Sequence, residues 1–289
     1  MQVDIAIVGA GAGGLAAAAS LLKQNPKLSI SVFDPAEEHY YQPGWTLVGS
    51  GIMPREKTVR LMDSVIPKKV SWVQEAVTEF HPDNDFITLA NGDDVTYKVL
   101  IVAPGLKVDY DAVPGLQDTL GQNGVSCNYH YDLAPYSWEC IKNLKSGKAI
   151  FTQPQMPIKC AGAPQKALYL AADYWREQGC LNAIDIQFRN AGAALFGVAD
   201  FVPVLNSYVE KYGARLEFNS NLIHVDGPNK IATFKVTDSE GNVTEVEESF
   251  DYLHAVPPQT SPDFIKNSPL SNEAGWLDVN QDTLQHNTY

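Results

Sequence analysis

The sequence has few cysteines and histidines, the residues that form disulfide scaffolds and many metal sites. It contains four cysteines in 289 residues, at positions 127, 140, 160 and 180. Four are too few for a disulfide framework in a chain of this length, which favours a reducing compartment or redox chemistry. None of them, and none of the six histidines, stands at metal-ligand spacing, so we predict no metal. Nucleophile-elbow, zinc-protease and P-loop motifs are also absent.

Positive charge is scarce as well. The chain has 21 Lys and Arg against 34 Asp and Glu, a formal net charge of -13 at pH 7. Nucleic-acid binding depends on clustered Lys and Arg that neutralise phosphates, so we predict no nucleic-acid partner. With 45% hydrophobic and 19% charged residues the composition is that of a globular protein, and the length predicts about two domains.

One long uncharged run is present, IAIVGAGAGGLAAAASLL at residues 5–22. Its length would admit a membrane span or a signal peptide, but no basic residue precedes it and glycines interrupt its middle. As strand, turn and helix, it places Gly9, Gly11 and Gly14 in a G-x-G-x-x-G motif. The first glycine allows a tight turn, the second lets backbone approach a pyrophosphate, and the third lets the helix pack on the strand.

An acidic residue completes this pattern. The strand LSISVFD ends at Asp34, twenty residues after Gly14, where a carboxylate can accept hydrogen bonds from ribose hydroxyls. Strand, turn, helix, strand and acid together predict dinucleotide binding. VSWVQEAV is predicted to form one strand. A further hydrophobic strand ends at Ala103-Pro104-Gly105, and both continue the α/β pattern.

A second α/β unit is predicted beyond residue 113. KAIFTQP is typical of a strand, and PQKALYLAADYWREQG of a helix with Pro164 at its first position. The turn between them, TQPQMPIKCAGAPQK, has no glycine motif for a dinucleotide and carries Cys160 instead. The following helix N-terminus and the charges of Lys159 and Lys166 favour a thiolate at Cys160, although a lone cysteine can also be buried and inert.

Several stretches resemble a known family. HYYQPGWTLVGSG, IKCAGAPQKALYL, LHAVPP and GWLDVNQDTLQHNTY resemble sulfide:quinone oxidoreductases, especially the mitochondrial-like type. Ala103-Pro104-Gly105 resembles a segment of the wider two-dinucleotide-domain flavoproteins. We therefore expect an α/β protein with tandem Rossmann-like domains of three-layer ββα architecture. The expected domains are 1–112, which binds FAD, 113–258, which carries the redox cysteine, and 259–289, which returns towards the FAD domain.

The resemblance also implies chemistry. In that family sulfide attacks a cysteine-bound disulfide or trisulfide, a thiolate passes electrons to FAD, sulfane sulfur leaves to an acceptor, and reduced FAD reduces quinone. Cys160 matches one of the family's two essential cysteines, and Cys127 is the best second candidate in this chain. Asp118 is a weaker candidate for an acid in the sulfide pocket. The predicted FAD-binding residues are Gly9, Gly11, Gly14, Asp34, Gln42, Pro43, Val77, Ala103 and Gly105.

The family pattern continues past the last residue of this chain. It adds a second flavin-binding segment, the partner redox cysteine and amphipathic helices that hold the membrane surface and the quinone. We therefore expect a fragment of a longer enzyme that holds FAD weakly, with sulfide, quinone and a sulfane-sulfur acceptor as partners. Because the fold begins directly at Met1, we expect no signal peptide and a bacterial protein peripheral to the cell membrane.

Two alternatives stay open. One is a neighbouring enzyme, either the flavin subunit of a sulfide dehydrogenase or a quinone-reducing NADH dehydrogenase. The other is a non-catalytic flavin- or nucleotide-binding protein. The absence of a glycine motif in the second unit predicts that NAD(P)H is not the reductant.

Overall fold

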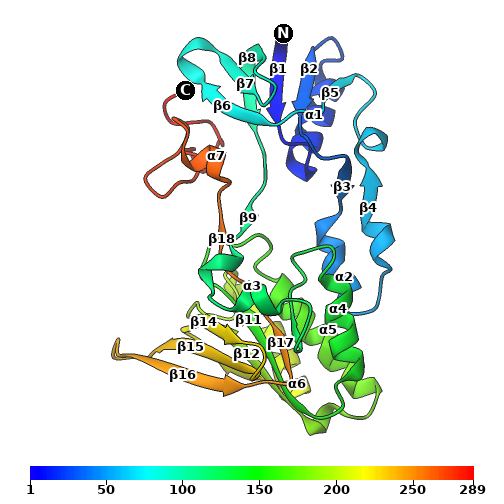
Figure 1. Cartoon of the computed structure of the whole chain (residues 1–289), viewed down its shortest axis with the longest axis vertical. Helices are drawn as coiled ribbons and strands as arrows, with labels where there is room; N and C mark the ends of the chain where they lie inside the picture. The colour runs from blue at the N-terminus through cyan, green and yellow to red at the C-terminus, as the bar shows by residue number, and fades with distance from the viewer. The chain divides into compact units, whose positions relative to one another are not determined.

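The computed structural model describes all residues from 1 to 289 and divides them into two compact units (Figure 1). Unit 1 comprises Met1–Tyr41, Val59–Lys107 and Thr260–Tyr289, and unit 2 comprises Gln42–Thr58 and Val108–Gln259. Each unit has its own parallel sheet and its own hydrophobic core. The predicted α/β class with Rossmann-like parallel sheets is confirmed.

Unit 1 is built on a six-stranded sheet with the strand order β5-β2-β1-β8-β7-β6. Its strands are β1 Gln2–Val8, β2 Ile30–Phe33, β5 Val70–Val73, β6 Val77–His81, β7 Phe86–Leu89 and β8 Asp94–Val102. β5, β2, β1 and β8 are parallel, and β7 and β6 extend the sheet antiparallel. β1 and β2 are buried along most of their length, which explains their continuous hydrophobic runs.

Two layers cover this sheet. Helix α1, Ala12–Gln24, packs Ala18 on one face, and the C-terminal segment packs Ile265 and Leu270 into the cluster on the other. Phe264 stacks on Phe80 of β6 with ring centroids 5.9 Å apart. The smaller elements are β3 Glu38–Tyr40, β4 Val59–Leu61, β9 Lys107–Val108, β18 Gln259–Thr260 and α7 Asp263–Lys266. Residues 260–289 are therefore part of the core of unit 1.

Unit 2 combines a five-stranded parallel sheet, ordered β10-β17-β11-β12-β13, with a three-stranded antiparallel sheet, β14-β15-β16. The parallel strands are β10 Val125–Ser126, β11 Gly147–Gln153, β12 Ile184–Asn190, β13 Arg215–Glu217 and β17 Tyr252–His254. The antiparallel strands are β14 Ser220–Asp226, β15 Ile231–Thr237 and β16 Val243–Ser249. The helices are α2 Trp45–Val48, α3 Leu116–Thr119, α4 Ala134–Asn143, α5 Ala163–Glu177 and α6 Val202–Tyr212. Short 3₁₀ segments in the chain are Gln42–Gly44, Arg55–Thr58, Met62–Ser64, Pro82–Asn84, Tyr110–Ala112, Leu181–Ala183 and Ala199–Phe201.

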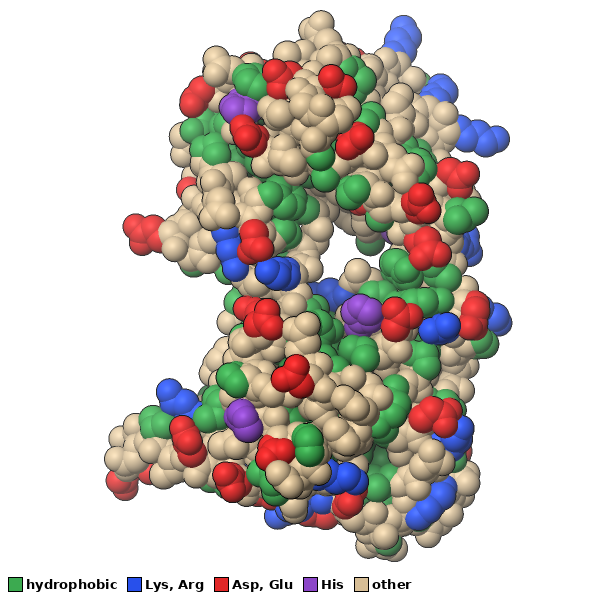
Figure 2. Space-filling model, in the orientation of Figure 1, with side chains coloured by type: hydrophobic (Ala, Val, Ile, Leu, Met, Phe, Trp, Pro, Cys, Tyr) green, Lys and Arg blue, Asp and Glu red, His purple; other side chains and the backbone are tan.

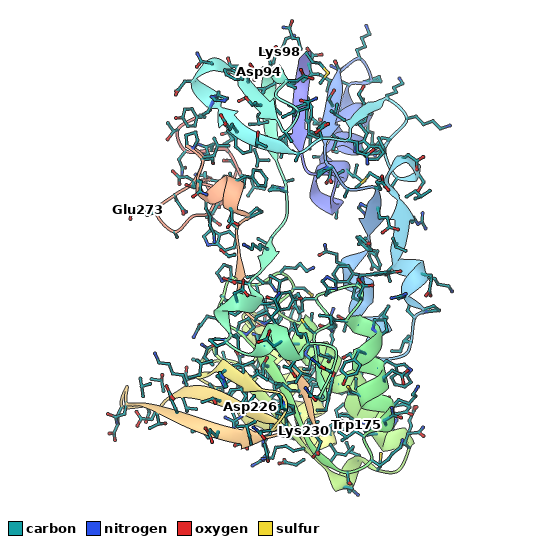
Figure 3. All side chains as sticks on the ribbon, viewed as in Figure 1. Asp94, Lys98, Trp175, Asp226, Lys230 and Glu273 are labelled. Carbon is teal, nitrogen blue, oxygen red and sulfur yellow. The ribbon has the colours of Figure 1, made fainter.

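Helix α5 packs on the parallel sheet through an amphipathic face. Ala167, Leu168, Ala171, Ala172 and Trp175 are buried, at the spacing that places them on one side of a helix. Trp175, labelled in Figure 3, has no exposed surface, and its Nε1 donates a hydrogen bond to the Ile141 carbonyl at 2.8 Å. This packing fixes the start of α5 relative to the carboxyl end of β11.

A charged network joins the two sheets of unit 2. A guanidinium nitrogen of Arg189, on β12, lies 2.6 Å from Glu248 Oε1, on β16, and Lys148 Nζ lies 2.6 Å from Glu248 Oε2. Burial raises the pKa of Glu248, but Lys148 and Arg189 outweigh that effect and hold the pKa below its ordinary value. The positive charges of Arg189 and Lys148 therefore compensate the negative charge of Glu248, as a buried ion pair requires.

The structure differs from the predicted elements at two places. VSWVQEAV is not one strand, because β5 ends at Val73 and Val77 begins β6, which pairs with β7 instead. Helix α5 begins at Ala163, one residue before Pro164.

The segment 42–58 is grouped with unit 2, whereas the sequence division placed it in the first domain. Its helix α2 packs on α4, and a Cβ added at Gly49 would lie 3.3 Å from the Cβ of Ser137. Asn128 Nδ2 also donates to Thr46 Oγ1 at 3.2 Å. The segment belongs to unit 2 because it contacts residues that are distant in the sequence, although its neighbours in the sequence belong to unit 1.

No helix in the structure combines the length and apolar character needed to cross a bilayer. Acidic side chains are distributed over both units on the face in Figure 2 and do not gather in one patch.

Candidate functional site

The turn between β1 and α1 is closed by two glycines that leave no room for a side chain. Gly9 has φ +98°, and a Cβ added there would lie 2.4 Å from the carbonyl oxygen of Ala103. A Cβ added at Gly14 would lie 2.0 Å from the carbonyl oxygen of Gly9. Both distances are far below contact, so the turn itself requires these two glycines.

Gly11 differs from its neighbours because the protein leaves open space beside it. Its φ is -72°, which any residue can adopt, and a Cβ added there would meet no atom within 4 Å. Gly11 is also the N-cap of α1, and no side chain caps this helix. The first backbone N–H groups of α1 therefore face a space that an anionic group can enter.

Asp34 lies beside this turn, at the end of β2. Its Oδ2 accepts a hydrogen bond from the Ala10 N–H at 2.7 Å, and its Oδ1 accepts one from the Ala36 N–H at 2.9 Å. A carboxylate can accept further hydrogen bonds on both oxygens, so ribose hydroxyls remain possible partners. An open glycine, an uncapped helix and a fixed carboxylate fit the pyrophosphate and ribose of a dinucleotide.

The remaining residues predicted for this site divide into two groups. Ala103 contacts the turn directly, and Gly105, with φ +81°, follows two residues later. Val77 is buried at the start of β6, and β8 and β7 separate that strand from β1 in the sheet. Its contact with FAD stays a prediction.

Cys160 lies in unit 2, in the loop between β11 and α5. Its thiol is free and exposed, and its backbone is in the left-handed region with φ +57°. Lys166 Nζ, one turn into α5, donates to Cys160 Sγ at 3.7 Å. A thiolate at Cys160 would therefore have an ammonium partner and the start of a helix beside it.

Lys159, the residue before Cys160, lies among aromatic and amide groups. Its Nζ is 5.2 Å from the centre of the Trp45 ring and 5.4 Å from that of Tyr129, and it donates a hydrogen bond to Gln42 Oε1. Burial lowers the pKa of Lys159, and the charges of Cys127 and Cys160 oppose that change. Both thiols are thus within electrostatic range of one ammonium group.

Cys127 follows β10 and has no exposed surface. It packs with Tyr129, Ala163 and Val256. Burial raises the pKa of Cys127 to about 11, although a hydrogen bond from the Tyr129 backbone, the Tyr110 hydroxyl and the charge of Lys159 act in the opposite direction. At neutral pH Cys127 is a neutral thiol.

The structure therefore gathers the predicted residues at two places, one in each unit. Gly9, Gly11, Gly14, Asp34 and Ala103 meet in unit 1. In unit 2, Gln42 contacts Lys159, and Cys127 and Cys160 lie within electrostatic range of it. Pro43 follows Gln42 in an exposed 3₁₀ turn. Asp118 is exposed on α3, and no interaction joins its carboxylate to either thiol.

Sequence reasoning missed two residues that contact the backbone of Lys159 and Cys160, namely Tyr129 and Gln259. The Tyr129 hydroxyl donates to the carbonyl groups of Lys159 and Cys160 at 3.1 and 3.3 Å. Gln259 Oε1 accepts a hydrogen bond from the Lys159 N–H at 2.7 Å. The nearness of Tyr129 to Cys127 in GVSCNY could have indicated the Tyr129 contacts, whereas no local pattern indicates the contact of Gln259.

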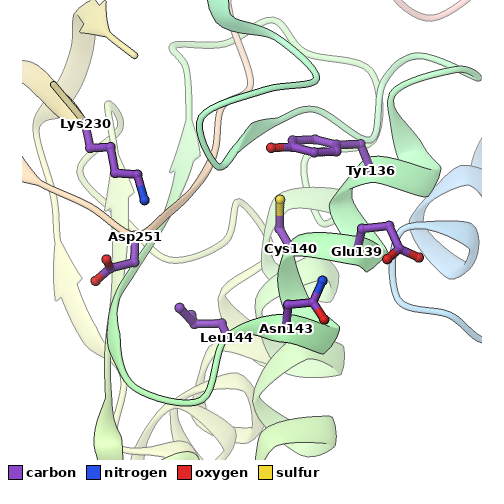
Figure 4. A pocket seen from close by; sticks show the side chains of 7 residues that line it. All are labelled: Tyr136, Glu139, Cys140, Asn143, Leu144, Lys230 and Asp251. Carbon is purple, nitrogen blue, oxygen red and sulfur yellow. The ribbon is translucent and has the colours of Figure 1, made fainter. Parts of the chain in front are cut away.

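A separate hollow of about 330 Å³ occurs elsewhere in unit 2. Figure 4 shows Cys140 and Asn143, on α4, opposite Lys230 and Asp251; the other lining residues are Tyr136, Glu139 and Leu144. The Asp251 carboxylate accepts the Lys148 N–H at 2.9 Å, so this hollow lies at the amino end of the parallel strands. It is distinct from the Cys160 loop, which follows the carboxyl end of β11. No group of three or more His, Cys, Asp or Glu side chains is arranged to hold a metal ion.

Comparison with known proteins gives consistent similarities. Residues 3–137 match the family model described as pyridine nucleotide-disulphide oxidoreductase. The mitochondrial sulfide:quinone oxidoreductase of Dictyostelium discoideum is 41% identical over 288 residues, 99% of this chain and 63% of that protein. The corresponding protein of Mus musculus is 35% identical over 286 residues, again 99% of this chain and 63% of that protein. The chain thus spans less than two thirds of the length of these relatives.

The fold is also shared with a solved structure. The sulfide:quinone oxidoreductase of Aquifex aeolicus superposes with a TM-score of 0.79 at 15% identity, over 96% of this chain and 64% of that one. At that identity the likeness concerns the fold, and it supports tandem dinucleotide-binding architecture.

The expectation of a bacterial protein peripheral to the cell membrane is wrong. The relatives with 35% and 41% identity over 99% of the chain are mitochondrial proteins of eukaryotes. Relatives with sulfide:quinone oxidoreductase or sulfide-quinone reductase names come from both mitochondria and a bacterium, so resemblance to the family carries no information about the compartment.

The resemblance predicted from the motifs is confirmed by these comparisons: over nearly its whole length, this chain is similar to the sulfide:quinone oxidoreductases of mitochondria.

Proposed function

We propose that this chain supplies the FAD-binding turn and a redox cysteine of a sulfide:quinone oxidoreductase. The observation that carries the proposal is the Cys160 loop. An exposed thiol with an ammonium 3.7 Å from its sulfur occupies the turn where a second dinucleotide-binding unit would have its glycine motif. The similarity to relatives that bear this name supports the assignment of the reaction.

The proposed reaction moves two electrons and one sulfur atom. Hydrosulfide attacks Cys160 Sγ in a disulfide with a second cysteine, so a new S–S bond forms and the old one breaks. Cys160 then holds the sulfur as a persulfide, and the second cysteine leaves as a thiolate with the electron pair. Transfer of the outer sulfur to an acceptor thiolate breaks the persulfide bond and releases Cys160 as a thiolate. The disulfide between Cys160 and the second cysteine then re-forms as the pair gives up two electrons, which FAD would accept when bound. Over the whole cycle, sulfide loses two electrons and quinone gains them, with two protons, as quinol.

The chain's own residues have defined parts in this proposal. The Lys166 ammonium, 3.7 Å from Cys160 Sγ, is placed as the counter-charge of the Cys160 thiolate that is released when the outer sulfur leaves. Cys127 is the second candidate cysteine, but its buried neutral thiol makes it the poorer nucleophile at neutral pH. The partner of Cys160 in the disulfide is therefore either Cys127 or a cysteine outside this chain.

The turn of unit 1 fits FAD as the dinucleotide. The backbone around Gly11 would hold the pyrophosphate and Asp34 the adenosine ribose, with Ala103 and Gly105 beside the turn. Gln42, Pro43 and Val77 are proposed as further contacts. When bound, FAD would accept the electron pair of the displaced thiolate and pass it to quinone. Sulfide, quinone and a sulfane-sulfur acceptor are the proposed partners.

The test is replacement of Cys160 in the FAD-loaded protein. Cys160→Ser should retain FAD and the fold, yet lose sulfide-driven flavin reduction by about 10³-fold or more, because a hydroxyl cannot form a persulfide. Cys180→Ser is the matched control, since this thiol donates to the Trp175 carbonyl at 3.6 Å and should be dispensable. Stopped-flow absorbance at the flavin band measures both rates. Normal reduction of Cys160→Ser by sulfide contradicts the proposal, and no reduction of the unmodified protein favours a non-catalytic flavin-binding protein.

A further inference from the structure

Lys159 is a partly buried cation without an acidic partner. None of the salt bridges in the structure includes it. Buried lysines are normally paired with a carboxylate, because removing the charge from water is costly. The Lys159 charge is instead surrounded by the faces of Trp45 and Tyr129 and by the Gln42 carbonyl oxygen. These neutral groups hold an ammonium in place but leave its full charge uncompensated.

The acidic groups within electrostatic range of this charge are two thiols, Cys127 and Cys160. Cys127 is buried and neutral at neutral pH, so only the exposed Cys160 can offer Lys159 a negative charge. Lys166 already contacts the Cys160 sulfur. The charge of Lys159 is therefore additional to what a single thiolate needs.

A second lysine over aromatic rings shows how the arrangement differs when an acid is present. Lys211 Nζ lies 5.3 Å from the ring centre of Tyr208 and 4.8 Å from that of Tyr212. It also lies 4.0 Å from Asp173 Oδ1. Both lysines therefore lie over two aromatic rings, but only Lys211 also has a carboxylate nearby.

We infer that Lys159 is an anion-recognition residue of the Cys160 site, which draws small anions such as hydrosulfide to the Cys160 sulfur and stabilises the persulfide anion that forms there. The inference rests on the proposed function for the identity of the anion. The site itself is a positive charge, fixed by Trp45, Tyr129 and Gln42, beside an exposed thiol. A purely structural role would be the alternative, in which Lys159 only ties the segment 42–58 to the loop before α5.

Two thiol reagents of matched size separate these roles. Iodoacetate and iodoacetamide alkylate the same thiolate, but only iodoacetate is an anion. The ratio of their rates at Cys160 therefore measures local positive potential, and changes in thiolate fraction cancel from it. The rates are followed by mass spectrometry of the peptide that contains Cys160.

In Lys159→Met the ratio of iodoacetate to iodoacetamide rates should fall about three- to tenfold, as expected for loss of one charge within several ångströms at an intermediate dielectric. Lys159→Arg should keep the ratio within about twofold of the unmodified protein, and Lys211→Met should leave it unchanged. Higher salt should lower the ratio of the unmodified protein towards that of Lys159→Met.

Equal changes in the two rates, or an unchanged ratio, would show that Lys159 is structural and overturn the inference. Failure of Lys159→Arg to restore the ratio would do the same. The result is independent of turnover. If Cys160→Ser still oxidises sulfide while the ratio falls in Lys159→Met, the anion site stands and the sulfide mechanism fails.

Discussion

At the scale of single residues, His254 is a fully buried ionisable group of unit 2. It ends β17 with no exposed surface, and its ring centre lies 5.7 Å from that of Phe151. Neither ring nitrogen makes a hydrogen bond within the chain. Burial lowers the pKa of His254 to about 4. The folded protein therefore keeps this imidazole neutral throughout the physiological range.

This pKa predicts a loss of stability in mild acid. The unfolded chain binds a proton at His254 below a pH of about 6.5, whereas the folded chain does not until about pH 4. Stability should therefore fall as the pH drops between these values, by about 1 kcal/mol from pH 7.0 to pH 5.5. Urea unfolding at the two pH values measures it.

His254→Leu should remove this pH dependence, because no proton is then taken up on unfolding at that position. His224→Leu, at an exposed position on β14, is the control and should retain it. The same loss of stability in all three proteins would mean that His254 titrates normally in the folded state.

The cysteines also differ in their burial at this scale. Cys160 is exposed beside Lys166, whereas Cys127 is enclosed and its pKa is raised to about 11. Burial raises the pKa of Cys140 to about 11 as well. Of these three thiols only Cys160 is exposed, which supports its proposed reaction with sulfur.

At the scale of elements, the three glycines of the β1–α1 turn differ in their roles. The fold requires Gly9 and Gly14, whereas Gly11 is the glycine proposed to admit a ligand. Gly11→Val should cost at most about 1 kcal/mol of stability, since valine is a poor N-cap but meets no atom within 4 Å. It should nevertheless abolish FAD binding, because the side chain occupies the space where backbone meets phosphate. Flavin fluorescence measures binding, and thermal unfolding by circular dichroism measures the fold.

Two further variants complete this test. Gly14→Ala should destabilise the unit by about 2 kcal/mol or more, since its Cβ would lie 2.0 Å from a backbone oxygen. Gly197→Val, at an open position in unit 2, should change neither property. Full FAD binding by Gly11→Val would place the pyrophosphate elsewhere.

At the scale of the whole molecule, the proposed chemistry is divided between the units. The dinucleotide turn belongs to unit 1, and the thiol, Lys159 and the segment 42–58 belong to unit 2. Unit 2 has the Rossmann-like order of strands and helices but presents Cys160 at the turn after β11. Unit 2 therefore has the architecture of a dinucleotide-binding fold, but the turn after β11 carries a thiol where such a fold has glycines that bind phosphate.

This arrangement predicts that NADH does not reduce the FAD-loaded protein. The turn after β11 lacks a G-x-G-x-x-G motif, so the pyrophosphate of NADH has no backbone cradle in unit 2. Stopped-flow mixing with NADH should leave the flavin oxidised over the time in which sulfide reduces it. Sulfide is the positive control for an active preparation. Flavin reduction by NADH at a rate near that of sulfide would instead support a quinone-reducing NADH dehydrogenase.

The sequence by itself determined the features that arise from neighbouring residues. The β1 strand, the glycine turn, α1 and Asp34 lie within 34 residues, and the position of Cys160 before α5 is equally local. Strand and helix periodicity, glycine sterics and helix ends act over such short distances, so they could be predicted. The resemblance to a family supplied the chemistry that these local patterns leave open.

Only the tertiary structure decided which distant residues meet. Lys159 contacts Gln42, 117 positions away in the sequence, and the same folding places segment 42–58 in unit 2. Burial of Cys127 and His254 likewise depends on the packing of several strands and helices. No local pattern specifies such contacts, because hydrophobic burial is not directional and selects partners only once the sheet and its helices have assembled.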